Sequence, residues 1–158
     1  MELKLVEPFI KSAQDVIKQM TDIDLEVSGN PYSQEGDLSF YGVVSIINFS
    51  GKVKGRFIID IMPSLAFKMA ENLMGEPCND MKSNMLLAAI SEMNNIIAGD
   101  ANTSINNELS LGLRLAPPIV FTGKNIIIAT SRIDATIIPC STPYGNIKLN
   151  IGFQGGGN

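Results

Sequence analysis

The sequence predicts an α+β fold, with a largely antiparallel sheet and about three helices packed on it. Three segments carry apolar residues at helical spacing, and the strand-like segments are grouped instead of alternating regularly with them. This grouping favours hairpins over the repeated strand–helix–strand units of a parallel sheet. The chain also contains neither a GxGxxG dinucleotide loop nor a Walker loop, so nothing argues for a parallel nucleotide-binding sheet.

The first helix is predicted from Val6 to Met20, where apolar residues recur at every third or fourth position. Pro8 is expected in its first turn, where a proline is tolerated. The following stretch, 22–36, is rich in polar residues, glycine and proline. It is expected to hold a short strand at 25–27 and then a loop.

A hairpin of buried strands is predicted from the β-branched and aromatic runs 40–49 and 51–61, which are separated by Ser50-Gly51-Lys52. A second helix is expected to begin near Pro63 and to stop at Gly75. Proline suits the first turn of a helix, and glycine suits its C-terminal cap.

The longest helical pattern runs from about residues 81–83 to about residue 107, with Gly99 as its one weak helix former. Beyond it the chain is predicted to return to strands, at 112–115, 119–121, 125–139 and 146–153. The turn at 141–145 should join the last two as an antiparallel hairpin. The glycine-rich residues 154–158 are expected to form a disordered tail, so that a single domain spans residues 1–153.

Composition and charge exclude several classes of protein. The net charge is −4, and the 12 Lys and Arg residues are scattered singly, so a nucleic-acid partner is not expected. The longest apolar runs, such as 125–129, are far shorter than the roughly 20 residues of a membrane-spanning helix. The first eight residues contain acids and a proline where a signal peptide has a basic region and then an apolar run, which predicts a cytoplasmic protein.

The available side-chain chemistry is narrow because the chain contains no histidine. Cys78 and Cys140 are isolated in sequence and are interpreted as buried thiols, without zinc or a disulfide framework. Carboxylates, hydroxyls and amides remain for any chemistry, and histidine bases and histidine-bound zinc are excluded.

One face of the third predicted helix carries the candidate site. Glu92, Asn95, Gly99 and Asn102 fall together on a helical wheel, opposite an apolar face that consists of Leu86, Ala89, Ile90, Met93, Ile97, Ala101 and Ile105. Ordinary solvation would explain an outward Glu and Asn. Glycine on an exposed helix face, however, costs roughly 1 kcal/mol relative to alanine, and Ala88 one turn before Glu92 is also small. We therefore expect a surface that another protein can approach closely.

The segment around Glu92 and Asn95, followed after 22 residues by Pro118, resembles the Glu-x-x-Asn…Pro signature of the CheC/CheX/FliY family of response-regulator phosphatases. The order of the predicted elements is also similar to that family, specifically to its CheX type, over nearly the whole chain. The first predicted helix has no second Glu-x-x-Asn motif, which fits the single-motif CheX type. Ala88 stands where the family pattern often has Asp or Ser. A second copy at 76–79 contains a proline and is interpreted as chance.

The resemblance implies that the substrate is the aspartyl-phosphate of a CheY-like receiver, which supplies the phosphoryl group, Mg²⁺ and a lysine. Asn95 would hold a water in line with the phosphorus, and Glu92 would pair with the receiver lysine. Gly99 and Asn102 would contact the partner, and this chain would bind no cofactor itself.

Neighbouring residues receive simpler interpretations. Asn94 and Asp100 are expected to be solvated, and Pro118 to give a rigid entry to the strand beside the helix. CheX-like proteins are typically homodimers joined through sheet edges, and the predicted strand 125–139 would make such an edge.

Two other functions remain open at this point. The first is a non-catalytic module that binds a receiver or a flagellar-switch protein with the same helix face. The second is a small-ligand-binding protein that uses the sheet face, for which the sequence shows no supporting cluster of residues.

Overall fold

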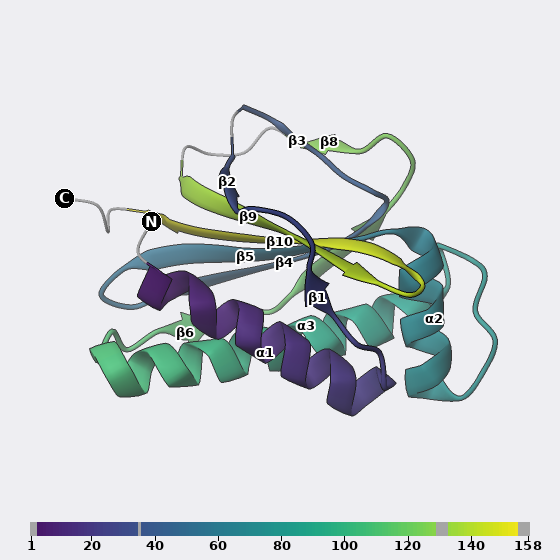
Figure 1. Cartoon of the computed structure of the whole chain (residues 1–158), viewed down its shortest axis with the longest axis horizontal. Helices are drawn as coiled ribbons and strands as arrows, with labels where there is room; N and C mark the ends of the chain where they lie inside the picture. The colour runs from purple at the N-terminus through teal and green to yellow at the C-terminus, as the bar shows by residue number, and fades with distance from the viewer. Residues whose placement is uncertain (1–2, 35, 129–132, 155–158) are drawn as a thin grey trace.

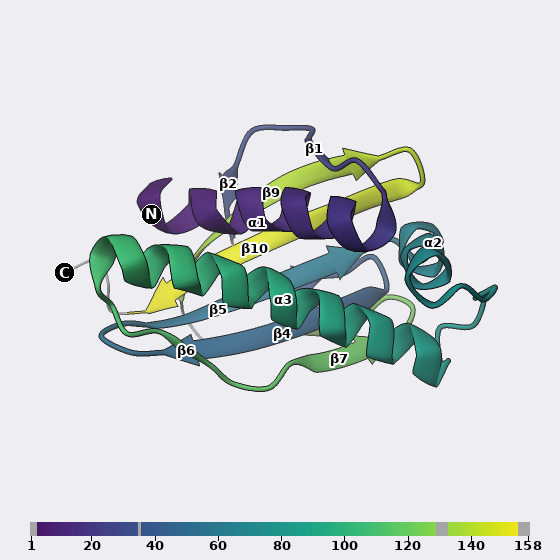
Figure 2. The same ribbon diagram turned by 90° about the horizontal axis from the view of Figure 1, so that it is seen from below.

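Two helices cover one face of a sheet and a third lies beyond one end of it in this computed structural model, which describes residues 3–34, 36–128 and 133–154. Helices α1 (Leu3–Thr21) and α3 (Asn84–Leu109) run side by side in opposite directions across one face, and α2 (Pro63–Met74) lies beyond one end of the sheet (Figures 1 and 2). Within the described ranges, no helix combines the length and the apolar composition that crossing a bilayer requires.

The main sheet has eight strands in the order β1-β9-β10-β5-β4-β6, with β2 also paired to β9 and β7 to β4. Every strand pairing among the described residues is antiparallel, which confirms the predicted α+β class. The strands of this sheet are β1 (Glu26–Val27), β2 (Tyr32–Ser33), β4 (Val43–Ser50), β5 (Lys54–Ile61), β6 (Arg114–Leu115), β7 (Ile119–Thr122), β9 (Asp134–Thr142) and β10 (Gly145–Gln154). A separate ribbon pairs β3 (Leu38–Ser39) with β8 (Ile127–Ile128).

Local signals placed most elements correctly. The hairpin β4–β5 and the hairpin β9–β10 both form, with Thr142 opposite Gly145 at the second turn. Gly75 ends α2 with a φ of 75°, a left-handed conformation that costs glycine little. Ser83 caps α3, because its Oγ accepts a hydrogen bond from Leu86 N at 3.4 Å.

Three details of the predicted fold are wrong: the place of Pro8 in the first helix, the extent of the strand 125–139, and the start of the C-terminal tail. Pro8 lies inside α1 beyond its first turn, where it removes a hydrogen bond to the carbonyl of Lys4; burial of Val6 and Phe9 on either side holds the helix together. The predicted strand 125–139 is not continuous, because β8 pairs with β3 and β9 begins only at Asp134; residues 129–132 lie outside the described residues.

The C-terminal prediction is wrong by at least one residue. Gln154 was assigned to the tail, but it belongs to β10 and pairs with Lys54 of β5. The remaining residues, 155–158, lie outside the described ranges.

The main core fills the space between the helices and the sheet. Phe9 of α1 packs on Phe57 of β5 with ring centroids 4.8 Å apart, and both side chains are fully buried. Cys78 and Cys140 are free and buried, as predicted, and burial raises the pKa of the Cys140 thiol to about 11. A smaller apolar cluster covers part of the opposite sheet face and consists of Leu38, Val44, Ile58 and Ile137.

Candidate functional site

Helix α3 presents the candidate site on the flank that points away from α1. Its core side chains are buried against the sheet and the other helices, as the sequence predicted: Leu86, Ala89, Ile90, Met93, Ile97, Ala101 and Ile105. On the α1 side, Ser12 Oγ donates a hydrogen bond to the carbonyl of Ile97 at 2.7 Å, which fixes the rotation of α3 relative to α1. The other flank faces β6 and β7 (Figure 2).

Glu92 and Asn95 are both exposed and lie one turn apart on this flank. Within the described part of the chain, neither side chain makes a hydrogen bond or an ion pair with another residue. A carboxylate and an amide are therefore available together to a molecule that approaches α3 from outside.

Asn94 lies between Glu92 and Asn95 in the sequence and was expected to be solvated, but its side chain is fully buried. Its Nδ2 donates a hydrogen bond to Ser45 Oγ of β4 at 2.8 Å, and its Oδ1 has no partner among the described residues. The prediction is wrong because Asn94 falls within about 40° of Ile90, Ala101 and Ile105 on the helical wheel, so the face of α3 that packs on the sheet includes it. Asp100 is exposed as predicted.

Asn102 is the main correction to the predicted site. It was expected to point outward with Glu92 and Asn95, but it is only 3% exposed, and neither its Oδ1 nor its Nδ2 has a partner among the described residues. The chain after α3 folds back along the helix: Asn106 Nδ2 donates to the carbonyl of Leu113 at 3.0 Å, and Leu113 N donates to Asn106 Oδ1 at 2.7 Å. A helical wheel cannot show this covering segment, because it treats the helix alone.

Gly99 lies at the border between the open and the covered part of the flank. It is half-buried, and a Cβ added to it would meet only Leu115 Cδ1, at 3.8 Å, which is an ordinary van der Waals contact. The described part of the chain therefore does not require glycine at this position for its own packing.

Pro118 immediately precedes β7, the strand that pairs with β4 next to α3. This position agrees with its predicted role as a rigid entry to a neighbouring strand. Thr122, at the other end of β7, donates a hydrogen bond from Oγ1 to the carbonyl of Met81 at 2.8 Å, close to the start of α3. Strand β7 is thus fixed at the edge of the sheet beside the exposed pair.

The second Glu-x-x-Asn copy does not reproduce this geometry. Glu76 and Asn79 lie in the connection between α2 and α3, not on a helix, and both are exposed. Cys78 between them is buried, and its N–H donates to Glu71 Oε1 at 3.0 Å. The two side chains are therefore not held one helical turn apart.

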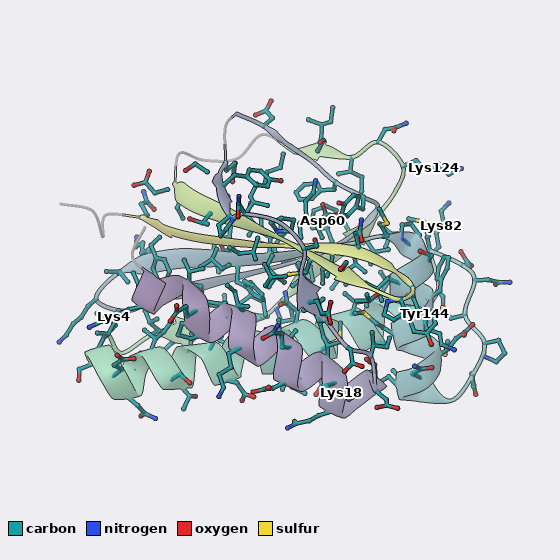
Figure 3. All side chains as sticks on the ribbon, in the orientation of Figure 1. Lys4, Lys18, Asp60, Lys82, Lys124 and Tyr144 are labelled. Atoms are coloured by element: carbon teal, nitrogen blue, oxygen red, sulfur yellow. The ribbon has the colours of Figure 1, made fainter. Side chains whose placement is uncertain are left out.

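The sheet face opposite the helices carries a polar cluster that the sequence interpretation missed. Asp60 of β5 is buried there between the main sheet and the β3–β8 ribbon (Figure 3), and Tyr41 N donates to its Oδ1 at 2.8 Å. Burial raises the pKa of Asp60 to about 6, and Lys148 opposite it on β10 opposes this shift. The available signal was a pair of charged residues, Arg56 and Asp60, four positions apart in the run 56–61, a spacing that places both side chains on the same face of the strand.

Metal ligands do not gather in the part of the molecule that the structure describes. In those ranges, no three His, Cys, Asp or Glu side chains come together in a way that could hold a metal ion. The exposed pair itself offers one carboxylate and one neutral amide.

The sequence of this chain matches a known protein family. The family model described as "Chemotaxis phosphatase CheX" matches residues 43–141, a span that includes Glu92, Asn95 and Pro118. The CheY-P phosphatase CheX of Thermotoga maritima is 23% identical to this chain over 128 residues, which make up 81% of each protein.

Two solved structures are similar over almost the whole chain. A CheC-like superfamily protein from Shewanella sp. PV-4 has a TM-score of 0.89 at 27% identity and covers 98% of this chain and 100% of its own. A chain of the CheX–CheY–BeF3–Mg²⁺ complex from Borrelia burgdorferi has a TM-score of 0.79 at 29% identity, and the match covers 94% of this chain and 97% of that one.

Proposed function

Because the chain belongs to the CheX family of chemotaxis phosphatases, we propose that it removes the phosphoryl group from the aspartyl-phosphate of a CheY-like response regulator. The observation that carries this proposal is the exposed pair Glu92 and Asn95, one turn apart on α3 and without a partner among the described residues. Two relatives give further support: the Thermotoga protein is named as a CheY-P phosphatase, and the Borrelia structure is a complex with CheY.

Asn95 is the proposed catalytic residue. Its side-chain amide both donates and accepts hydrogen bonds, so it can hold a water molecule in line with the phosphorus without acting as a base. Positioning is the main contribution that phosphoryl transfer needs from the protein. A chain that lacks histidine can therefore supply this contribution.

Glu92 is proposed to pair with a lysine of the receiver. Its carboxylate stands one turn from Asn95, so a salt bridge there would fix the register in which the amide enters the receiver site. The phosphoryl group and Mg²⁺ are expected to come with the receiver, and this chain is expected to bind no cofactor. Gly99, at the border of the exposed flank, is the further position proposed to contact the partner.

The direct test measures phosphate loss from receiver domains of the same organism. Each receiver is phosphorylated with a small-molecule donor and Mg²⁺, and wild-type protein is compared with Asn95→Ala. Removal of the positioning amide is expected to lower the rate by about 100-fold or more. Asn107→Ala is the matched control, because Asn107 is another exposed asparagine of α3, near its C-terminal end.

Three outcomes would contradict the phosphatase assignment. In the first, no receiver loses phosphate faster when the protein is present. In the second, Asn95→Ala matches the wild type. In the third, a receiver binds tightly to both proteins without faster phosphate loss, which would identify a non-catalytic binding module.

A homodimer and a cytoplasmic location remain proposals. The outer side of β9 is already paired in its described part, with β1 at Cys140 and Ser141 and with β2 at Thr136 and Ile137, so β9 is not the open edge that the sequence suggested. Light scattering tests the dimer, because one chain has a mass of 17.0 kDa and the dimer has twice that mass. A mass of one chain at working concentration would contradict it.

A further inference from the structure

A cavity of about 460 Å³ opens on the sheet face opposite the helices, near the turn of the β4–β5 hairpin. Three cations line it, Lys54, Arg56 and Arg114, together with the neutral polar residues Asn48, Ser50 and Gln154. None of its described lining residues is an Asp or a Glu. This concentration of positive charge occurs in a chain whose net charge is −4.

Arg56 is the unusual member of this group because it is buried. It is only 7% exposed, and its Nη2 donates a hydrogen bond to Gln34 Oε1 at 3.1 Å. Its Nε has no hydrogen-bond partner, and no carboxylate forms an ion pair with the guanidinium, within the described residues. Burial lowers the pKa of Arg56, as expected for a cation that lacks a compensating charge.

The neutral neighbours do not compensate the charge of Arg56. Gln34 Oε1 also accepts a hydrogen bond from Asn150 Nδ2, at 3.2 Å, so Arg56 and Asn150 share this acceptor. A buried charge is costly unless it is paired with an opposite charge. A guanidinium is also well suited to bind an oxyanion through two parallel N–H donors.

A second cavity on the same face, about 630 Å³, has a different character. It is lined by two carboxylates, Asp37 and Asp60, and by Lys148, and Lys148 Nζ lies 4.6 Å from the centre of the Tyr41 ring. Its charges are mixed, so it does not favour an anion. The cavity at Arg56 differs because every charged residue in its described lining is a cation.

We propose that the cavity at Arg56 binds a small molecule through a phosphate group, with Arg56 as the buried anchor and Lys54 and Arg114 as the outer contacts. A phosphate monoester carries a charge of about −1.5 to −2 at pH 7, which three cations can balance. The exposed positions of Lys54 and Arg114 leave the rest of the ligand open to solvent. This site is separate from Glu92 and Asn95 and does not depend on the proposed phosphatase activity.

The test follows the thermal unfolding midpoint and the heat of binding of the full chain during titration with inorganic phosphate. Sodium chloride at the same ionic strength is the reference, and acetate is the comparison anion. A saturable rise is expected with phosphate. Arg56→Gln is expected to weaken binding about tenfold or more, and Lys54→Gln and Arg114→Gln several-fold each. Lys124→Gln is the control, because Lys124 is exposed far from this cavity (Figure 3).

The two outer variants keep the test valid if Arg56→Gln does not fold, since they change exposed side chains. Equal effects of phosphate and chloride, or binding that all three substitutions leave unchanged, would overturn the proposal. Tight binding of acetate without binding of phosphate would overturn the assigned ligand class. If Lys54→Gln and Arg114→Gln instead abolish a dimer while phosphate does not bind, the cavity belongs to an interface between copies of this chain, and the proposal fails.

Discussion

At the residue scale, Gly99 allows the requirements of folding to be distinguished from those of partner binding. The described structure leaves room for a Cβ, which would approach only Leu115 Cδ1 at 3.8 Å. Gly99→Ala should therefore raise the free energy of unfolding by about 0.5–1 kcal/mol, because alanine is the better helix former and restricts the unfolded chain. Urea denaturation followed by circular dichroism measures this change.

The same variant also tests whether Gly99 contacts the receiver. If the receiver approaches this part of α3 closely, Gly99→Ala should slow receiver dephosphorylation although the protein is more stable. A variant that is both more stable and fully active would remove Gly99 from the proposed contact surface. Lower stability would show that the space beside Leu115 is smaller than the structure indicates.

Asn94 and Ser45 form a second test at this scale, because a buried polar pair links the helix of the site to the sheet. Asn94 Nδ2 donates to Ser45 Oγ at 2.8 Å, and both residues are fully buried. Each single substitution to alanine leaves the other side chain with an unpaired polar group, at a cost of about 1–3 kcal/mol. A double-mutant cycle should give a coupling energy of about 0.5–1.5 kcal/mol. A coupling energy near zero would contradict the hydrogen bond.

At the element scale, the cap of α3 sets where the helix that carries the site begins. Leu86 N donates to Ser83 Oγ at 3.4 Å, which is long for a hydrogen bond. Ser83→Ala should therefore lower the free energy of unfolding by about 0.5–1 kcal/mol, the lower part of the range for a lost cap. Ser104→Ala, an exposed position in the same helix, is the control and should be neutral or slightly stabilising in the same urea titration.

The elements also show what local sequence can predict. Helix α2 was predicted from Pro63 and Gly75, and the β4–β5 hairpin from two apolar runs around Gly51, because caps, turns and periodicity act over a few residues. The strand predicted for 125–139 failed because Ile127 pairs with Ser39 of β3, a partner far away in sequence. Such a pairing leaves no signal in the strand itself.

The same holds for the candidate site: features set by local helix geometry were predictable, and features set by distant segments were not. Glu92 and Asn95 were predicted correctly as exposed, because the geometry of α3 alone determines the direction in which they point. Asn102 is buried because Asn106 holds the chain around Leu113 against the same helix. The outer sheet face, with Arg56 and Asp60, was missed because charged residues in a strand become a cluster only when neighbouring strands and loops cover them.

At the scale of the whole molecule, the sheet has one face filled by helices and another on which charged groups are buried. Phe57 and Ile59 of β5 belong to the main core, whereas Arg56 and Asp60 alternate with them and point to the other face. The stability of the molecule should therefore depend on pH through the second face. Because burial raises the pKa of Asp60 to about 6, that dependence belongs to mildly acidic solution.

The sign follows from linkage between protonation and folding. Well below pH 4, Asp60 is protonated in both the folded and the unfolded chain and adds no pH dependence. Between pH 4 and 6 the unfolded chain releases this proton first, so ionisation of Asp60 favours unfolding as the pH rises. Asp60→Asn keeps an acceptor for Tyr41 N and carries no charge. The variant therefore does not lose stability through ionisation at this position as the pH rises. Its stability relative to wild type should rise by roughly 2–3 kcal/mol from pH 4 to pH 6.5 and then level off.

Urea denaturation of both proteins at half-unit pH intervals measures this difference directly. Asp37→Asn is the matched control, because it removes another carboxylate that lines the same cavity but is exposed. The prediction is wrong if the stability of Asp60→Asn relative to wild type stays constant or falls as the pH rises. Asp60 would then be ionised in the folded protein, with its negative charge compensated by its surroundings. The carboxylate would then be held by Lys148, the cation opposite it on β10, more strongly than burial opposes its charge.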